Sequence, residues 1–425
     1  MLGIESGTVI EDACWEEVPA MPGGGPQVMI TAHVRPHARR AARCGICGRR
    51  APGYDQGEGR RRWRALDLGT VRAEIEADAP RVHCAVHGVT VARVPWARHG
   101  AWHTRGFEDT AAWLACVTSK TTITELMRVS WRAAGSMIER VSAEKLAGTD
   151  RMAGLRRTGI DEIAYRKGFK YLVVVVDHDS GRLIWAAPGR DKATVLKFSG
   201  ALGEERSAQL THVSADGASW IAGAVTERAP QAEQCTDPFH VVSWATEALD
   251  EVRREVWNHA RAGQPASGRV RKYGRATGDA RDLKNARYAL WKNPEDLTAN
   301  QAAQLDWISK THPYLHRAWL LKEGLRVIFK LKGHPRLAAR ALDSWLAWAA
   351  RSRIPQFIEL GRKIRYYRPG IEAALRHSLS NGLIESVNTK LRAITRAAFG
   401  FHGPEPMIAL GMLALGGLRP ALPGR

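Results

Sequence analysis

Six consecutive apolar residues, YLVVVV at positions 171–176, restrict the possible folds of this chain more than any other stretch. The run has the length of a β-strand and is much shorter than the 18 or so apolar residues of a membrane-spanning helix. Because it is apolar at every position and not only at alternate ones, both of its faces must be buried. The run therefore predicts a central strand in a sheet that is covered on both sides.

The segments around this run alternate between strand-like and helix-like patterns. The expected strands are TGIDEIAY (158–165), the apolar run itself, RLIWAAPG (182–189) and QLTHVSADG (209–217). EQCTDPFHVV (233–242) is expected to be a fifth strand or the exit from one. Helices are expected at DKATVLKFSGAL (191–202) and ASWIAGAVTERA (218–229). Three hairpin-connected strands followed by helix, strand, helix and strand form the layout of an RNase H-like α/β sheet, in which the first and fourth strands are neighbours.

Residues 241–375 have long helical patterns instead and are predicted to form a helical insertion domain. Within them, the basic and glycine-rich segment GQPASGRVRKYGRATGDARDLK (263–284) is expected to be a mobile loop. A further amphipathic helix, SNGLIESVNTKLRAITRAAFG (380–400), follows the block.

Two pairs of metal-ligand residues lie before position 90. Cys44 and Cys47 form one pair, and Cys84 and His87 form a second pair with the same two-residue gap. Between the pairs, residues 60–77 read as a β-hairpin, so the pattern predicts a zinc ribbon that holds one structural Zn²⁺. His83 could replace Cys84 or His87 as a ligand. The other interpretation is that Cys44 and Cys47 are free thiols and that His87 is a surface histidine.

Three short helical patterns follow the cysteine-rich region. They cover FEDTAAWLACVT (107–118), TITELMRV (122–129) and SWRAAGSMIERV (130–141). Thr122 or Thr124 is expected to cap the second helix, and Ser130 the third. This arrangement suits a helix-turn-helix, in which Trp131, Arg132 and Ser136 would face the major groove of DNA or its phosphates. A plain helical linker is the alternative.

The overall charge favours a polyanionic partner. The chain has 63 Lys and Arg against 43 Asp and Glu, a net charge of +20. This excess points to nucleic acid. The N-terminus has no signal-peptide pattern and no apolar run is long enough for a membrane span, so we expect a cytoplasmic, nucleoid-associated protein without a membrane partner.

Three carboxylates on separate expected elements are candidates for one site. Asp161 lies within the first strand, Asp216 at the end of the fourth, and Glu385 near the start of the late helix. Glu385 has no Lys or Arg three or four residues away, although a solvated glutamate near a helix N-terminus is the simpler interpretation. Carboxylates that converge repel each other unless a cation holds them. Mg²⁺ or Mn²⁺ suits such ligands, and two such ions support phosphodiester cleavage.

With these motifs in place, the chain resembles the DDE transposases of bacterial insertion sequences, of the ISL-three group with an N-terminal zinc ribbon. The matching stretches are the ribbon cysteines, GIDEIAYRKGFKY, VSADG, DPFHVV and SNGLIESVNTKLRAITRAAFGFH. The resemblance covers nearly the whole chain and implies Asp161, Asp216 and Glu385 as the catalytic triad. Ser386 departs from the Gly that often follows the glutamate, and His87 stands where a fourth cysteine is usual.

The resemblance implies a transposase that binds the terminal inverted repeats of its element, cuts DNA with two Mg²⁺ or Mn²⁺ ions and joins the 3′-hydroxyl ends to target DNA. Such proteins act on paired ends, so a homo-oligomer is expected. The expected regions are a zinc ribbon at 1–100, a helix-turn-helix at 101–155, a first core part at 156–240, a helical insertion at 241–375 and a second core part at 376–425. The rival functions are a DNA-binding regulator without catalysis and an RNase H-like nuclease without strand transfer.

Several further polar residues are assigned to the surroundings of the triad. Asp237 and His240 are expected to support the metal-binding acids, although Asp237 could equally be a capping or turn residue. Asn388 is expected to order Glu385 or to contact DNA. Lys390, Arg392 and Arg396 are expected to contact DNA phosphates, with a solvated basic face as the alternative.

Three other acids are expected to lie away from the site. Glu162 follows Asp161 along the strand and should point to the other face of the sheet. Asp177 and Asp179 end the second strand and should lie in a turn at the opposite edge.

Overall fold

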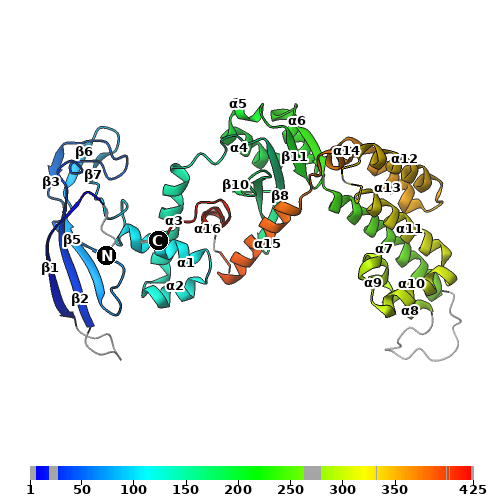
Figure 1. The fold of residues 1–425 in the computed structure, drawn as a ribbon, viewed down its shortest axis with the longest axis horizontal. Helices are drawn as coiled ribbons and strands as arrows, with labels where there is room; N and C mark the ends of the chain where they lie inside the picture. Colours follow the sequence, from blue (N-terminus) through cyan, green and yellow to red (C-terminus); the bar gives the residue numbers. More distant parts are fainter. Residues whose placement is uncertain are drawn as a thin grey trace.

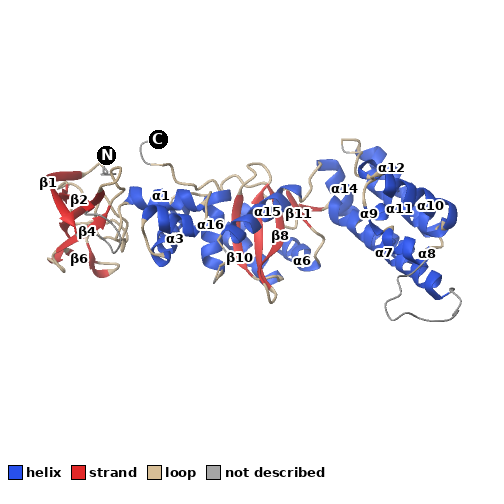
Figure 2. Ribbon diagram, turned by 90° about the horizontal axis from the view of Figure 1, so that it is seen from below, coloured by secondary structure: helices blue, strands red, loops and turns tan. Residues whose placement is uncertain are grey.

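The computed structural model describes residues 6–18, 27–262, 279–331, 333–398, 400–401 and 403–422. The molecule is elongated, and four regions follow one another along its long axis (Figures 1 and 2). A β-rich N-terminal region comes first, followed by a three-helix region, a central sheet with its helices, and a helical block at the far end. Among the described residues, none of the helices combines the length and the apolar character that crossing a membrane requires.

The N-terminal region consists of two small sheets. Its strands are β1 (Thr8–Val18), β2 (Gln27–Pro36), β3 (Gly53–Asp55), β4 (Arg60–Arg64), β5 (Arg72–Asp78), β6 (Arg81–Cys84) and β7 (Gly88–Val91). One sheet has the order β1-β2-β5-β4 and the other β3-β6-β7. The hairpin predicted for residues 60–77 is confirmed as the antiparallel pair β4 and β5. Trp63 and Trp96 pack edge to face in the core of this region, with ring centroids 5.6 Å apart.

The three-helix region has the order predicted for it. Its helices are α1 (Arg105–Ala115), α2 (Lys120–Met127) and α3 (Trp131–Ala147). The Ser130 side chain accepts a hydrogen bond from the Ala133 N–H, which confirms Ser130 as the cap of α3. The expected cap of α2 was wrong: Ser119 accepts from the Thr122 N–H, so the helix begins one turn earlier.

The central sheet contains β8 (Arg157–Arg166), β9 (Lys170–Asp177), β10 (Leu183–Pro188), β11 (His212–Ala215) and β12 (Glu233–Thr236). Its order is β10-β9-β8-β11-β12, so the first and fourth strands are neighbours as predicted. β10, β9 and β8 pair antiparallel, whereas β11 is parallel to both β8 and β12.

Both faces of β9 are buried, as its continuous apolar run predicted. Leu172, Val174 and Val176 belong to one apolar core, and Val173 and Val175 belong to another on the opposite face. α4 (Lys192–Leu202), α5 (Glu204–Ser207) and α6 (Ser219–Arg228) follow β10 and β11, and α4 and α6 supply the second core.

The helical block extends from β12 to the late helix. It contains α7 (Pro238–Ala262), α8 (Asp279–Asn285), α9 (Arg287–Trp291), the short 3₁₀ helix η1 (Pro294–Asp296), α10 (Ala299–Thr311), α11 (Pro313–Ile328), α12 (Pro335–Arg351), α13 (Pro355–Tyr366) and α14 (Arg368–His377). Most of the expected loop at 263–284 lies outside the described residues. The part that is described, 279–284, belongs to α8, because Ala280 is buried and Leu283 packs into the core of the block.

The chain then returns to the central sheet. α15 (Gly382–Ala397) lies along β8 in Figure 1, and α16 (Pro404–Leu415) packs between α3 and β10. Ile384, Val387 and Leu391 of α15 share one apolar core with β8, β9 and the helices α1, α3 and α16. The late helix is therefore fixed by the sheet and by the three-helix region together.

A buried ion cluster attaches the N-terminal region to the three-helix region. Arg98 Nη1 contacts Glu108 Oε2 at 3.3 Å and Arg98 Nη2 contacts Asp109 Oδ1 at 2.7 Å. The Arg98 side chain is 7% exposed and that of Glu108 is 0% exposed. Glu108 also accepts from Arg140 Nε at 2.9 Å, so one buried carboxylate joins α1, α3 and the segment that precedes them.

Removing the buried Arg98 guanidinium should lower the free energy of unfolding. We expect Arg98→Ala to destabilise the chain by about 3 kcal/mol, because the buried Glu108 then loses half of its compensating charge. Urea unfolding measures the change. Arg362→Ala is the matched control, since Arg362 is 70% exposed and pairs with the equally exposed Glu359, so it should change stability by less than about 0.5 kcal/mol. Equal effects of the two variants would contradict this account.

Candidate active site

The parallel pairing of β8 with β11 brings Asp161 and Asp216 together. The pairing aligns Ser214 with Gly159, and its continuation places Asp216 beside Asp161. One carboxylate oxygen from each of Asp161, Asp216 and Glu162 lies within 4.8 Å of the other two. Three acids therefore meet at the end of β11.

The expectation that Glu162 points away from Asp161 was wrong. Alternation along a strand does place neighbouring side chains on opposite faces. However, β11 pairs with β8 only as far as Gly159, so beyond that point β8 has a paired strand, β9, on one side only, and the Glu162 carboxylate can reach around the open side. Its carboxylate reaches the same group as Asp161 and Asp216 and pairs with Arg190 Nε at 2.9 Å.

The acidic group is desolvated and short of positive charge. Burial raises the pKa of Asp161 to about 7, and the charges of Glu162 and Asp216 act in the same direction. Burial also raises the pKa of Glu162, together with the charge of Asp216. Glu162 Oε2 is buried and has no hydrogen-bond partner in the described part of the chain. An orphaned carboxylate oxygen beside two other acids is an arrangement that a divalent cation would satisfy, so these residues fit such an ion.

Glu385 lies in a second group with Asp237 and His240, whose ligand atoms are also within 4.8 Å of one another. Asp237 is 1% exposed, and its Oδ2 accepts from the His240 N–H at 3.2 Å and contacts His240 Nδ1 at 3.0 Å. Its Oδ1 accepts from the Asn381 N–H at 2.9 Å. Asp237 thus caps α7, as one interpretation of the sequence expected, and also ties α7 to the start of α15.

Two side chains connect the groups. Asn388, one turn after Glu385 on α15, donates from Nδ2 to Asp161 Oδ2 at 2.8 Å. The hydrogen bond to Asp237 raises the pKa of His240, and the charges of Asp237, Asp216 and Asp161 add to this. His240 therefore lies in the electric field of both groups. Asp161 and Asp216 are in direct proximity, whereas Glu385 belongs to the adjoining group.

The electrostatics of Glu385 agree with this placement. Burial raises its pKa, and the charge of Asp237 acts in the same direction, while His240 and Arg392 oppose the shift. Arg392 lies two turns away from Glu385 along α15, which is farther than the spacing of three or four residues at which helical side chains usually form ion pairs.

The four predicted zinc ligands form a compact cluster. Cys47 Sγ and Cys84 Sγ are 3.8 Å apart, and His87 Nδ1 lies 3.6 Å from Cys44 Sγ and 3.7 Å from Cys84 Sγ. A tetrahedral zinc site would have edges of about 3.8 Å between sulfurs and about 3.6 Å between sulfur and nitrogen. The residues therefore fit one zinc ion. His83 is exposed and does not belong to the cluster, so the alternative ligand is excluded.

The residues predicted to contact DNA lie on the surface or close to it. Arg132 is exposed and Ser136 is half-buried near the start of α3. Lys390, Arg392 and Arg396 are exposed on α15. Their side chains form no ion pair with any other residue that the structure describes.

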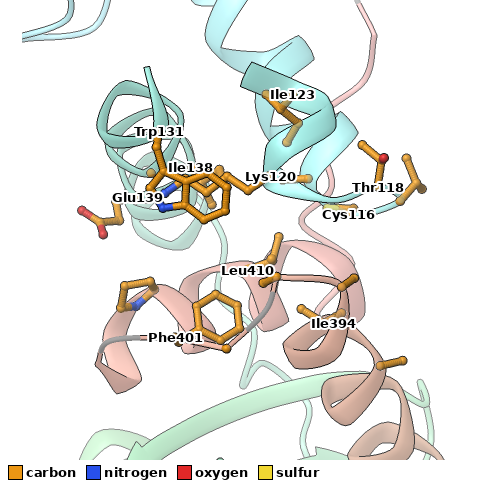
Figure 3. Close-up of a pocket in the computed structure, with 18 residues that line it drawn as sticks. Cys116, Thr118, Lys120, Ile123, Trp131, Ile138, Glu139, Ile394, Phe401 and Leu410 are labelled. Carbon is orange, nitrogen blue, oxygen red and sulfur yellow. The ribbon is translucent and has the colours of Figure 1, made fainter. Parts of the chain in front are cut away.

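Trp131, at the start of α3, is 43% exposed. It lines a cavity of about 400 Å³ between α2, α3 and the last two helices. Figure 3 shows its ring on one side of the cavity and Phe401 on the opposite side, with Lys120 beside the indole. The Lys120 ammonium lies 4.7 Å from the indole centroid. The ring thus faces the rest of the molecule as well as solvent.

Asp177 and Asp179 lie where the sequence predicted. Asp177 pairs with Thr158 at the beginning of β8, and its carboxylate accepts from the Asp179 N–H in the following turn. Asp179 accepts from Arg157 Nε at 2.8 Å. Both acids lie at the beginning of β8, whereas Asp161 and Glu162 lie in the middle of this strand.

The chain is similar to known transposases over its whole length. A transposase family model of the ISL3 group matches residues 158–410. The zinc finger of the transposases IS204/IS1001/IS1096/IS1165 matches residues 40–87, and the helix-turn-helix domain of transposase family ISL3 matches residues 92–142.

Individual relatives agree with the family models. The transposase for insertion sequence element IS1557 of Mycobacterium tuberculosis is 57% identical over 435 residues, which cover 100% of this chain and 96% of the relative. The transposase for insertion sequence element IS1001 of Bordetella parapertussis is 28% identical over 247 residues, which cover 58% of this chain and 57% of the relative.

The unusual environment of Asp161 can be measured directly. In Mg²⁺-free protein, we expect its carboxyl group to titrate near pH 7, because burial and like charges disfavour ionisation. Carboxyl ¹³C NMR checks this midpoint, and Asp161→Asn assigns the signal. Asp216→Asn should lower the midpoint because it removes a like charge. Since a proton and a cation compete for Asp161, Mg²⁺ affinity should rise as the pH is raised towards 7 and level off above it. A midpoint near the ordinary value of about 4 would contradict this account.

Proposed function

Because the chain belongs to the ISL3 family of insertion-sequence transposases, we propose that it cuts the ends of its own element and joins the 3′-hydroxyl ends to target DNA. The observation that carries this proposal is the group of Asp161, Asp216 and Glu162, with its orphaned buried oxygen. A site of this kind, with Glu385 and His240 adjoining it, suits metal-assisted phosphodiester chemistry.

In this proposal Asp161, Asp216 and Glu385 hold two Mg²⁺ or Mn²⁺ ions. When bound, the ions supply activation of a water or 3′-hydroxyl and stabilisation of the leaving oxygen. Asn388 orients the Asp161 carboxylate through its hydrogen bond at 2.8 Å. Asp237 holds His240 through Nδ1, which leaves the other ring nitrogen free to carry a proton towards a phosphate oxygen.

The strand order supports assigning the central sheet as RNase H-like. Three antiparallel strands followed by two strands parallel to the first, with helices on both faces, are the layout that the sequence predicted. The helices α7 to α14 then form an insertion between β12 and α15. We place the domain boundaries near residues 100, 155, 240 and 375.

We assign DNA recognition to the first two regions and to α15. The zinc ribbon and the helix-turn-helix would bind the terminal inverted repeats, with Arg132 and Ser136 at the start of α3 against the DNA. Lys390, Arg392 and Arg396, which are exposed on the helix that carries Glu385, would bind phosphates near the cut. Joining two ends of one element requires paired chains, so we propose a homo-oligomer on DNA.

Cleavage should depend on Asp216. We expect Asp216→Asn to reduce Mg²⁺-dependent cleavage of the element's end DNA on the order of 1,000-fold, because it removes a metal ligand worth several kcal/mol in the transition state. Binding to the same DNA should remain within about threefold, since phosphate contacts by Arg and Lys dominate affinity. Gel analysis of the products measures both cleavage and strand transfer.

The same gels test a control variant and distinguish the proposed function from the rival functions. Asp179→Asn removes an exposed acid at the beginning of β8 and should leave cleavage unchanged. Cleavage that survives Asp216→Asn would contradict the assigned triad. Wild-type protein that binds the ends without cutting would favour a regulator, and hydrolysed ends without joined products would favour a nuclease.

One zinc ion should stabilise the N-terminal region. We expect about one Zn²⁺ per chain by elemental analysis, and Cys47→Ser should lose it because a thiolate ligand is replaced by a weak one. The same variant should lower the thermal stability of the region. Cys14→Ser is the control, since Cys14 lies outside the cluster. Zinc retained in Cys47→Ser, or lost in Cys14→Ser, would contradict the ligand assignment.

A further inference from the structure

A cleft lies in the helical block, and one end of it is lined by residues next to His240 in the chain. It has a volume of about 830 Å³ and lies between α7 on one side and α9 and α11 on the other. Phe239 and Pro238 line one end of it, next to His240, and Arg254 lies about four turns further along α7. The volume falls within the range of small-ligand sites, which is roughly 300–1,000 Å³.

Phe239 stands at the mouth of this cleft with most of its ring uncovered. The residue is 65% exposed, although phenylalanine normally gains free energy from burial. Its ring centroid lies 6.0 Å from that of His240 in an edge-to-face arrangement. His240 is held by Asp237 in the group that contains Glu385. An uncovered aromatic surface thus adjoins the position where DNA would be cut.

The opposite wall offers a second aromatic ring and an unopposed cation. The Arg287 guanidinium lies 3.8 Å from the centroid of the Trp291 indole. Trp291 Nε1 is buried and has no acceptor among the described residues. Arg287 forms no ion pair within the part of the chain that the structure describes, whereas Arg326 in the same cleft is neutralised by Glu323 and Glu295. Because Trp291 Nε1 is covered, the wall offers a ligand the Arg287 guanidinium and not the indole donor. Two acids also line the cleft, Glu247 and Asp250, and Asp250 pairs with Arg254 at 3.1 Å.

We propose that this cleft binds one unpaired nucleotide of the DNA end, next to the phosphodiester bond that is cut. The inference rests on the proposed function and names a subsite for its substrate. The base stacks on Phe239, and Arg287 attracts the phosphate. The nucleotide must be unpaired, because a base inside a duplex has both of its faces covered by its neighbours.

A protein segment is the less favoured occupant. An apolar peptide would not need the Arg287 guanidinium, and it has no reason to lie beside the carboxylates that we propose to act on a phosphodiester. A nucleotide uses the aromatic surface, the cation and the proximity to the acids together.

The test combines a change in the protein, Phe239→Ala, with the removal of single bases from the DNA, and asks whether the two effects are coupled. Full-length wild type and Phe239→Ala are bound, without added Mg²⁺, to end DNA that is intact or has a single abasic site at each position around the cut. Fluorescence anisotropy gives each affinity. We expect Phe239→Ala to weaken binding of intact DNA by about 5-fold or more, the usual effect of losing one stacked base. At one abasic position this effect should disappear, since the stacking partner is already absent.

Two further variants control the result. Phe239→Tyr keeps the aromatic surface and should bind like the wild type. Leu337→Ala removes an apolar side chain of the same block that is 53% exposed and outside the cleft, and it should show no coupling to any abasic position. The inference is overturned if Phe239→Ala has the same effect on intact DNA and on every abasic DNA, or no effect, while the wild type binds the ends. Failure of the wild type to bind end DNA would instead overturn the proposed function, and this subsite with it.

Discussion

The register of two parallel strands is the constraint on which the rest of the structure depends. Pairing of β11 with β8 stops at Gly159, and this single alignment brings the carboxylates of Asp161, Glu162 and Asp216 within 4.8 Å of one another. Like charges at that distance oppose folding unless they are protonated or neutralised. Burial raises the pKa of Asp161, and the charges of Glu162 and Asp216 act in the same direction. A slip of one residue would turn Asp161 to the other face of the sheet and abolish the group.

The helix α15 extends this constraint to the DNA-binding regions. Near its start it carries Asn388, which holds Asp161, and Glu385, which faces Asp237 and His240. Its buried side is packed in the same apolar core as α1 and α3, and its last turns line the cavity beneath Trp131. The position of Glu385 is therefore set by the sheet, by α7 and by the three-helix region at once. Direct packing therefore joins the helices that we propose to bind DNA to the site that we propose to cut it.

Much of this fold was predictable because local patterns and topology agree. Continuous apolar character identified β9 as a buried strand, and the order of strands and helices was enough to place Asp161 near Asp216. Equal spacing in two ligand pairs identified the zinc cluster. Glu162 was missed because alternation along a strand ignores where the neighbouring strand ends. The prediction of a loop was wrong for residues 279–284, which belong to α8, because composition cannot show that Leu283 packs into a distant core. The strands β1 and β2 drew no prediction, since much of β1 is exposed and its pairing is decided by the rest of the sheet.

The central claim is that the acids at the end of β11, with Glu385, hold a pair of divalent cations. Electron paramagnetic resonance of the full-length protein titrated with Mn²⁺ on its end DNA at pH 8 tests this most directly. The account predicts two bound Mn²⁺ per chain with the spectral broadening of ions about 4 Å apart, and loss of that coupled signal in Asp161→Asn. A wild-type protein that binds no Mn²⁺ on DNA, or an Asp161→Asn variant that keeps the coupled pair, would contradict it.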